Sequence, residues 1–168
     1  VKRREIISEA FLDFVVNKTD IRPDYMNNPQ ELKKVTDLVA EIKDDPDVTV
    51  RAINVIGYAS PEGLLSNNQR LSEGRAKALT GYLASRFDYP RSLYQVAFGG
   101  ENWDGLKECV EASQMPYRKE VLEFIGSFPA ECGYADQVRR KKTLMNLKGG
   151  EPYRYIIREF CPLLRKAI

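Results

Sequence analysis

The sequence contains no histidine. Histidine is the usual general base of serine and cysteine hydrolases and the commonest protein ligand for metal ions. Its absence excludes most familiar catalytic constellations. We therefore expect a protein that is not an enzyme, with no catalytic residues, no metal site and no cofactor.

Cysteine is scarce. The three residues Cys109, Cys132 and Cys161 are widely spaced, with no Cys-x-x-Cys pair. This spacing excludes the common zinc sites and a thioredoxin-type redox site. At most one disulfide can form within the chain, and the odd count leaves the redox compartment open.

Long apolar runs are also missing, since no stretch approaches the roughly 18 residues of a membrane-spanning helix. We expect a chain that does not span a membrane. It shows no signal peptide and opens at Val1 rather than Met, so we expect a piece excised from a larger protein.

A concentrated positive charge is absent as well. The chain has 26 basic and 24 acidic residues and a net charge of +2, so nucleic acid is not an expected partner. The basic runs Lys2–Arg4 and Arg139–Lys142 are interpreted as solvated surface, because consecutive charges on a helix point in all directions.

The length of 168 residues and the 43% hydrophobic share predict one folded domain over residues 1–168. Three segments are typical of strands, Ala10–Val16, Val48–Ile56 and Leu93–Phe98. Two helices are expected between them. The first begins near Asn28 as cap, with Pro29 at the first helical position, and ends near Asp44; the second follows a capping box of Ser66 and Gln69 and ends near Arg86.

The last third of the chain reads as short helices followed by a strand. Residues 1–100 thus form a βαβαβ core, residues 101–162 a helical insertion, and residues 163–168 the start of a last strand. The helices expected in the insertion are Trp103–Ala112, Pro116–Ile125, Asp136–Leu147 and Pro152–Phe160.

The most informative segment runs from Ile53 to Leu83: a buried strand, a loop at Gly57–Gly63 and a helix. Ligands of α/β folds bind where such a loop leaves the carboxyl end of a strand, and the helix dipole favours an anion there. Arg75 falls in or beside the apolar stripe of the helix, so its guanidinium needs an acceptor. Two acceptors explain this position equally well. One is an internal salt bridge to a carboxylate such as Glu62 or Glu73, and the other is a ligand carboxylate bound by two parallel hydrogen bonds.

These residues resemble the motif of the OmpA-like C-terminal domain, a family that binds peptidoglycan non-covalently in the periplasm. Phe11–Pro23 is similar to the family's first strand and turn. The Gly-Tyr-Ala-Ser-Pro-Glu-Gly loop and the later helices resemble a branch found in outer-membrane proteins of Bacteroides-type bacteria. The motif positions are Gly57, Gly63, Asn68, Leu71-Ser72, Arg75-Ala76 and Tyr82-Leu83.

The resemblance implies an α/β (α+β) two-layer sandwich with extra helices before a final strand. It also implies a non-catalytic domain that anchors an outer-membrane or surface-assembly protein to peptidoglycan in the periplasm. In the family an Asp and an Arg hold the zwitterionic end of the diaminopimelate residue of the stem peptide. Arg75 matches that Arg, whereas the Asp position is Ser60.

Ser60 is neutral and cannot supply the charge of the missing Asp. Glu62, two residues on, is a candidate to reach the same space, and the alternatives are that Ser60 hydrogen-bonds a different muropeptide or glycan group or that the pocket is vestigial. Together with the motif residues Asn68 and Leu71, these side chains make up the expected ligand-binding site: Ser60, Glu62, Asn68, Leu71 and Arg75. The family's later Arg has a candidate counterpart in Arg165.

Two other functions compete with this one. A protein-interaction or structural domain on the same fold, with a degenerate peptidoglycan pocket, would dock an envelope partner through aromatics of the insertion, such as Trp103, Tyr117, Tyr134 and Tyr153. An enzyme would need Ser60 or Cys132 as nucleophile and Glu62 as base. No recognisable activation scheme accompanies these residues.

Overall fold

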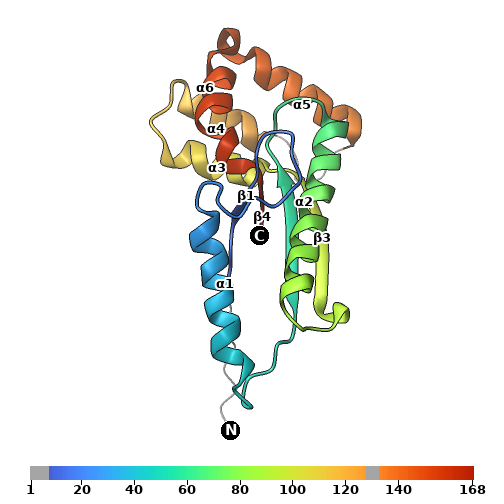
Figure 1. Ribbon diagram of the computed structural model, residues 1–168. Helices are drawn as coiled ribbons and strands as arrows, with labels where there is room; N and C mark the ends of the chain where they lie inside the picture. Colours follow the sequence, from blue (N-terminus) through green and yellow to red (C-terminus); the bar gives the residue numbers. More distant parts are fainter. Residues whose placement is uncertain (1–7, 128–132) are drawn as a thin grey trace.

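A computed structural model describes residues 8–127 and 133–168 (Figure 1). It combines helices with one mixed four-stranded sheet, the α+β sandwich expected from the sequence. The run Lys2–Arg4 and Cys132 lie outside the described residues. The elements are β1 (Leu12–Asp13), α1 (Asn28–Lys43), β2 (Ile53–Ala59), α2 (Leu65–Arg86), β3 (Tyr94–Glu101), α3 (Trp103–Ala112), α4 (Arg118–Gly126), α5 (Tyr134–Asn146), α6 (Glu151–Glu159), α7 (Cys161–Leu164) and β4 (Lys166–Ala167), with 3-10 turns at Arg91–Leu93 and Leu147–Gly150.

The sheet has the strand order β1-β4-β2-β3. Strands β2 and β3 are parallel and are joined through α2, which confirms the predicted βαβ unit. The final strand β4 inserts between β1 and β2 and runs antiparallel to both. The first and last strands therefore pair in one sheet, and helices α3 to α7 lie in sequence between β3 and β4.

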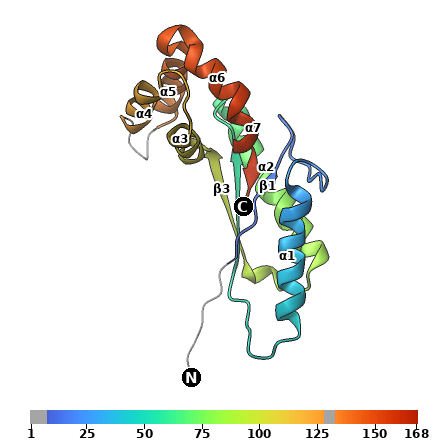
Figure 2. The same cartoon turned by 90° about the vertical axis from the view of Figure 1, so that its left-hand side faces the viewer.

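Helices α1 and α2 lie on one side of the sheet (Figure 2). Their apolar residues bury a core against the inner face of the strands, with members such as Leu12, Val55, Ala76, Leu79 and Ala167. Helix α2 comes so close that the hydroxyl of Ser72 donates to the carbonyl of Gly57 and accepts from the amide of Gly100, both at 2.8 Å. This serine thus bridges β2 and β3.

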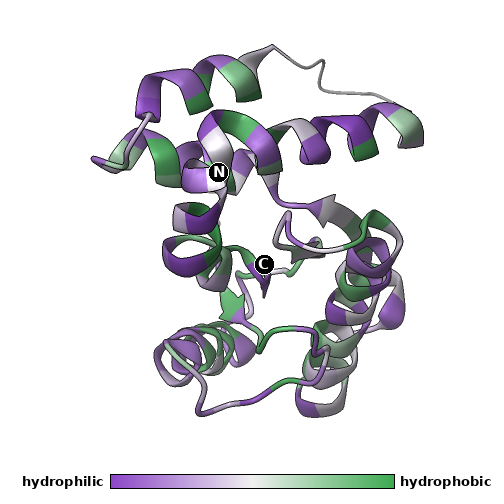
Figure 3. Cartoon of the chain, turned by 90° about the horizontal axis from the view of Figure 1, so that it is seen from above, coloured by the Kyte–Doolittle hydropathy of each residue, from purple (hydrophilic) through white to green (hydrophobic). Residues whose placement is uncertain are grey.

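The helices α3 to α7 enclose a second core of their own. In Figure 2 they stand at the upper end of the sheet, and along the helices hydrophilic and hydrophobic segments alternate (Figure 3). That amphipathic pattern lets short helices bury one face against each other. The fully buried members of this core are Leu106, Val110, Val121, Leu144, Ile156 and Cys161. Tyr153 belongs to it, whereas Tyr117 and Tyr134 are exposed.

The strands differ in extent from the expectation. Strand β1 covers only two residues of Ala10–Val16, because α1 side chains take its outer hydrogen bonds. The Glu31 carboxylate accepts from the Phe11 amide at 3.2 Å, and the Asn28 side chain bonds both the N–H and the C=O of Asp13. Strand β2 begins later than Val48 and continues through Gly57, and β3 continues through the two glycines to Glu101.

The predicted helix caps were wrong. Asn27, not Asn28, precedes α1, and the buried Asn28 amide instead bonds backbone groups of Asp13 and Arg22. Helix α2 is preceded by Leu64 without a side-chain cap, so Ser66 and Gln69 form no capping box.

The end of the chain and one inserted helix also differ from the expectation. The segment expected to start the last strand first forms helix α7, and the strand itself covers Lys166–Ala167. Helix α4 starts at Arg118, so Pro116 precedes it rather than opening it. Within the described ranges, no helix has both the length and the apolar character needed to cross a membrane.

Candidate functional site

The candidate site lies where β2 ends and α2 begins. Strand β2 ends at Ala59, a short loop carries Ser60 and Glu62, and α2 starts at Leu65. The apolar stripe of α2 faces the sheet and carries Leu71 and Arg75 among its buried residues. All five residues expected from the sequence therefore come from this one strand, loop and helix.

Arg75 is fully buried, with 0% of its surface exposed. Its guanidinium donates to three backbone carbonyls: Nε to Lys18 at 3.0 Å, Nη1 to Tyr58 at 2.9 Å and Nη2 to Val15 at 3.4 Å. It also lies 5.4 Å from the centre of the Phe14 ring. Arg75 thereby fastens the segment after β1 to the end of β2.

The sequence left open an internal salt bridge from Arg75 to Glu62 or Glu73, and the structure shows no such ion pair. Within residues 8–127 and 133–168, no carboxylate forms an ion pair with it, and Glu73 pairs with Lys77 instead. Burial, together with the nearby charges of Arg165 and Arg70 and against the opposing charge of Glu62, lowers the pKa of Arg75 to about 10. Arg75 is therefore still a cation at neutral pH, in surroundings where positive charges outnumber negative ones.

Glu62 is held by Arg165, which comes from the segment between α7 and β4. Its Oε1 accepts from Arg165 Nε at 3.0 Å and Nη2 at 2.5 Å, and also from the Ser60 hydroxyl at 2.8 Å. The ion pair is largely buried, with side chains 11% and 22% exposed. A charge-assisted contact of this kind fixes the loop against the last part of the chain.

Asn68 links the loop to β3. Its side-chain amide donates to the Glu62 carbonyl and to the Glu101 carboxylate, both at 2.6 Å. Glu101 in turn binds Lys141 of α5 in a buried ion pair at 2.5 Å and accepts from the Trp103 indole. Helix α5 of the insertion thus contacts the candidate site through the Lys141–Glu101 ion pair.

The structure brings Ser60, Glu62 and Asn68 into direct contact, and the charge of Glu62 acts on Arg75. Leu71 is buried in the apolar face of α2 and makes no polar contact. Sequence reasoning missed Glu101 and Lys141, which carry no motif. Arg165 was indicated by the family resemblance alone.

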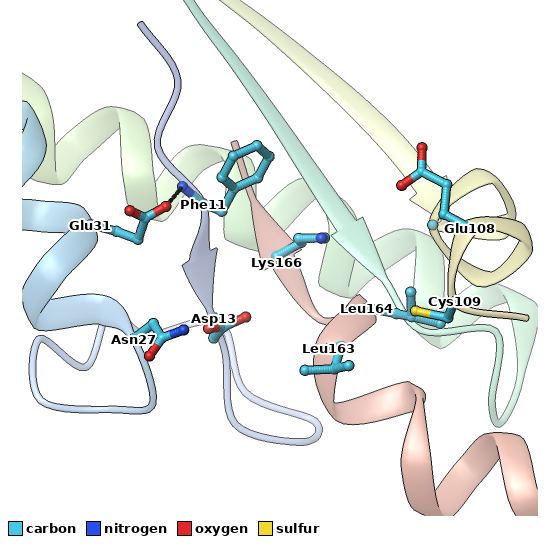
Figure 4. A pocket seen from close by; sticks show the side chains of 10 residues that line it. Phe11, Asp13, Asn27, Glu31, Glu108, Cys109, Leu163, Leu164 and Lys166 are labelled. Carbon is cyan, nitrogen blue, oxygen red and sulfur yellow. Dashed lines mark hydrogen bonds between the residues drawn. The ribbon is translucent and has the colours of Figure 1, made fainter. Parts of the chain in front are cut away.

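A separate hollow lies beside the sheet (Figure 4). It has a volume of about 370 Å³ and lies between β1, β4 and the helices α1, α3 and α7. Burial raises the pKa of the Asp13 carboxyl in its wall, against the opposing effect of Lys166. It contains none of the five predicted residues. Its lining residues are Phe11, Asp13, Asn27, Glu31, Gly105, Glu108, Cys109, Leu163, Leu164 and Lys166.

Metal ligands are not grouped in the described part of the chain, where no three Cys, Asp or Glu side chains are close enough together to hold a metal ion. The polar groups of the candidate site are a guanidinium pair, carboxylates, an amide and a hydroxyl. Such a set can bind a charged ligand by hydrogen bonds and ion pairing.

The thiol beneath the loop provides a test of how tightly the site is closed. Cys161 is fully buried. Burial, followed by the negative charge of Glu62, raises the pKa of this thiol to about 12 from an ordinary value of 9.0. Because only the thiolate reacts, we expect iodoacetamide at pH 8 to alkylate Cys161 about a thousandfold more slowly in the folded protein than in urea.

Peptide mapping by mass spectrometry measures this rate for each cysteine separately. Cys109 is less buried and serves as the internal comparison, with faster labelling in the folded state. Equal rates for Cys161 in buffer and in urea would show that the loop and α7 open freely.

No protein-family model matches this chain. A stretch of 54 residues is 39% identical to "Outer membrane protein 41" of Porphyromonas gingivalis (strain ATCC BAA-308 / W83). The stretch makes up 32% of this chain and 14% of that protein. The chain is thus similar in part to an outer-membrane protein, which is compatible with a role in the cell envelope.

Proposed function

We propose that this chain is a non-catalytic periplasmic domain that binds the stem peptide of peptidoglycan through a carboxylate at Arg75. It would anchor an outer-membrane or surface-assembly protein to the cell wall. The observation that carries the proposal is the buried Arg75 cation, which contacts three neutral carbonyls and no carboxylate of the described residues.

A buried charge without a contacting counter-ion is costly, and a ligand carboxylate would remove that cost. Arg165 and Arg70 act on the same guanidinium, so the field of the site favours an anion over a cation. The motif resemblance and the partial similarity to an outer-membrane protein support peptidoglycan as the source of the carboxylate.

The contact between Nη2 and Val15 indicates where the carboxylate would enter. At 3.4 Å it is the longest of the three Arg75 hydrogen bonds and lies beyond the usual range for N–H···O bonds. Displacing this carbonyl therefore costs least. The side chains of Val16, Asn17 and Lys18 in the covering segment are exposed, so shifting them uncovers little buried surface.

The test is calorimetric titration of the protein with a stem tripeptide ending in diaminopimelate, compared with the same peptide whose diaminopimelate carboxylates are amidated. We expect saturable binding of the acid and a loss of at least tenfold in affinity for the amide, because the charge-assisted hydrogen bonds disappear. The comparison changes the ligand and leaves the protein fold untouched.

Ser60→Asp extends the test by restoring a carboxylate at the position where the resembled family has one. We expect it to tighten binding of the zwitterionic peptide, and Lys77→Gln on the exposed side of α2 to leave binding unchanged. If neither wild type nor Ser60→Asp binds the peptide, peptidoglycan is not the ligand.

A second candidate is a protein-interaction or structural domain with a closed, degenerate pocket. It is favoured by the complete burial of Arg75 and by the internal hydrogen bonds of Ser60, Glu62 and Asn68. For a degenerate pocket we expect no peptide binding by the wild-type protein and a gain of binding in Ser60→Asp.

A further inference from the structure

The basic run Arg139–Lys142 divides into two pairs with different surroundings. Lys141 is buried and pairs with Glu101, and the guanidinium of Arg140 lies 4.2 Å from the centre of the Trp103 ring. These two residues attach α5 to the rest of the molecule. Arg139 and Lys142 lie on the opposite, exposed side of the helix.

The exposed pair forms part of a hollow of about 610 Å³ at the end of α5. Three of its lining residues are cationic and none is acidic. Arg139 pairs with Asp136 at 3.6 Å, but both side chains are more than half exposed, so this ion pair is weak. The lining residues are Arg139, Lys142, Thr143, Asn146, Leu147 and Lys148.

Lys148 belongs to the turn that closes this hollow. Its backbone is left-handed, with φ 50° and ψ 46°, and the next two residues are left-handed glycines. The turn sends the chain from α5 into α6 and keeps Lys148 beside the last turn of α5. Its ammonium lies 5.8 Å from the centre of the Tyr117 ring and remains exposed.

An exposed apolar strip runs beside the cations. Val138 and Met145 are 43% and 45% exposed. Seven residues apart, they lie almost in line on the helix, and Lys142 between them is turned by only about 40°. A helix face with cations next to apolar side chains is typical of segments that bind at a membrane surface.

We propose that this face of α5, with Lys148, binds the phosphate groups of an anionic phospholipid surface. The cations around the hollow would pair with headgroup phosphates, and Val138 and Met145 would contact the acyl region beneath. A soluble phosphate would use the cations but not the apolar strip, so the two features together favour a lipid surface. This inference does not depend on the Arg75 site.

The experiment is flotation of the protein with vesicles of phosphatidylglycerol mixed with phosphatidylcholine, against vesicles of phosphatidylcholine alone. We expect binding to the anionic vesicles, weakened by salt. The double variant Lys142→Gln/Lys148→Gln should bind roughly thirtyfold more weakly, given the usual contribution of each basic residue at an anionic surface.

The matched control is Lys107→Gln/Lys119→Gln. It removes two exposed lysines that lie on α3 and α4, outside the hollow, and should keep at least a third of the wild-type affinity for anionic vesicles. Val138→Ser/Met145→Ser should weaken vesicle binding without changing the charge. The proposal is overturned if the wild-type protein does not bind anionic vesicles, or if the control variant loses as much vesicle affinity as the test variant. It is also overturned if free glycerol phosphate binds the protein as tightly as the vesicles do.

Discussion

Replacing Arg75 with alanine is expected to lower the free energy of unfolding by about 3–5 kcal/mol. The change removes three hydrogen bonds and takes the guanidinium donor from the carbonyls of Lys18 and Tyr58, while the Val15 carbonyl keeps its bond from the Lys18 amide. It also removes the contact with the Phe14 ring and opens a cavity beneath the covering segment. Urea unfolding followed by circular dichroism measures the loss.

Arg70→Ala is the matched control for Arg75. Arg70 lies on the exposed side of the same helix, where its guanidinium donates to the Asn67 side chain one turn away, so its loss should leave the unfolding midpoint unchanged. If Arg75→Ala unfolds at the wild-type midpoint, the three carbonyl contacts are not structural. Arg75 would then be a residue kept for a ligand.

Alanine in place of Gly57 should be at least as damaging, with a loss of more than about 3 kcal/mol or failure to fold. A Cβ at this position would lie 2.1 Å from the Ser72 carbonyl oxygen and 2.6 Å from the Ala76 amide nitrogen. Both are backbone atoms of α2, so the whole helix would have to move away from β2. Soluble yield and the unfolding midpoint report the effect.

Gly81→Ala in the same helix should have the opposite effect. A Cβ there meets no atom within 4 Å, and alanine is the better helix former by about 0.5–1 kcal/mol. We therefore expect Gly81→Ala to raise the midpoint. Wild-type stability in Gly57→Ala would contradict the close packing of α2 on β2.

Helix α2 serves both the fold and the candidate site. Ser72 and Ala76 hold the helix against β2, and this close packing carries Arg75 beneath the loop. The site is then closed from the other side by two ion pairs, Glu62 with Arg165 and Glu101 with Lys141. Residues far apart in the chain thus set how accessible the site is.

The sequence alone predicted the βαβ unit, the long second helix and the series of short helices after β3. These features rest on local patterns: β-branched runs, apolar residues at helical spacing, and glycine or proline at element ends. The absence of histidine and the motif around Arg75 also come directly from the sequence. The ligand-binding role of Ser60, Glu62, Asn68, Leu71 and Arg75 stays a prediction.

Tertiary structure decided which partners the polar residues have. Asn28 was predicted as a cap and instead completes the edge of β1, and Arg75 donates to carbonyls rather than to a carboxylate. Arg165 reaches Glu62 across 103 residues. Local patterns predict helices because the hydrogen bonds of a helix join near neighbours, and they predict strands because the side-chain pattern along one strand is local even though its hydrogen bonds are not. The partners of buried polar groups join residues that only the packed fold brings together, so no local pattern specifies them.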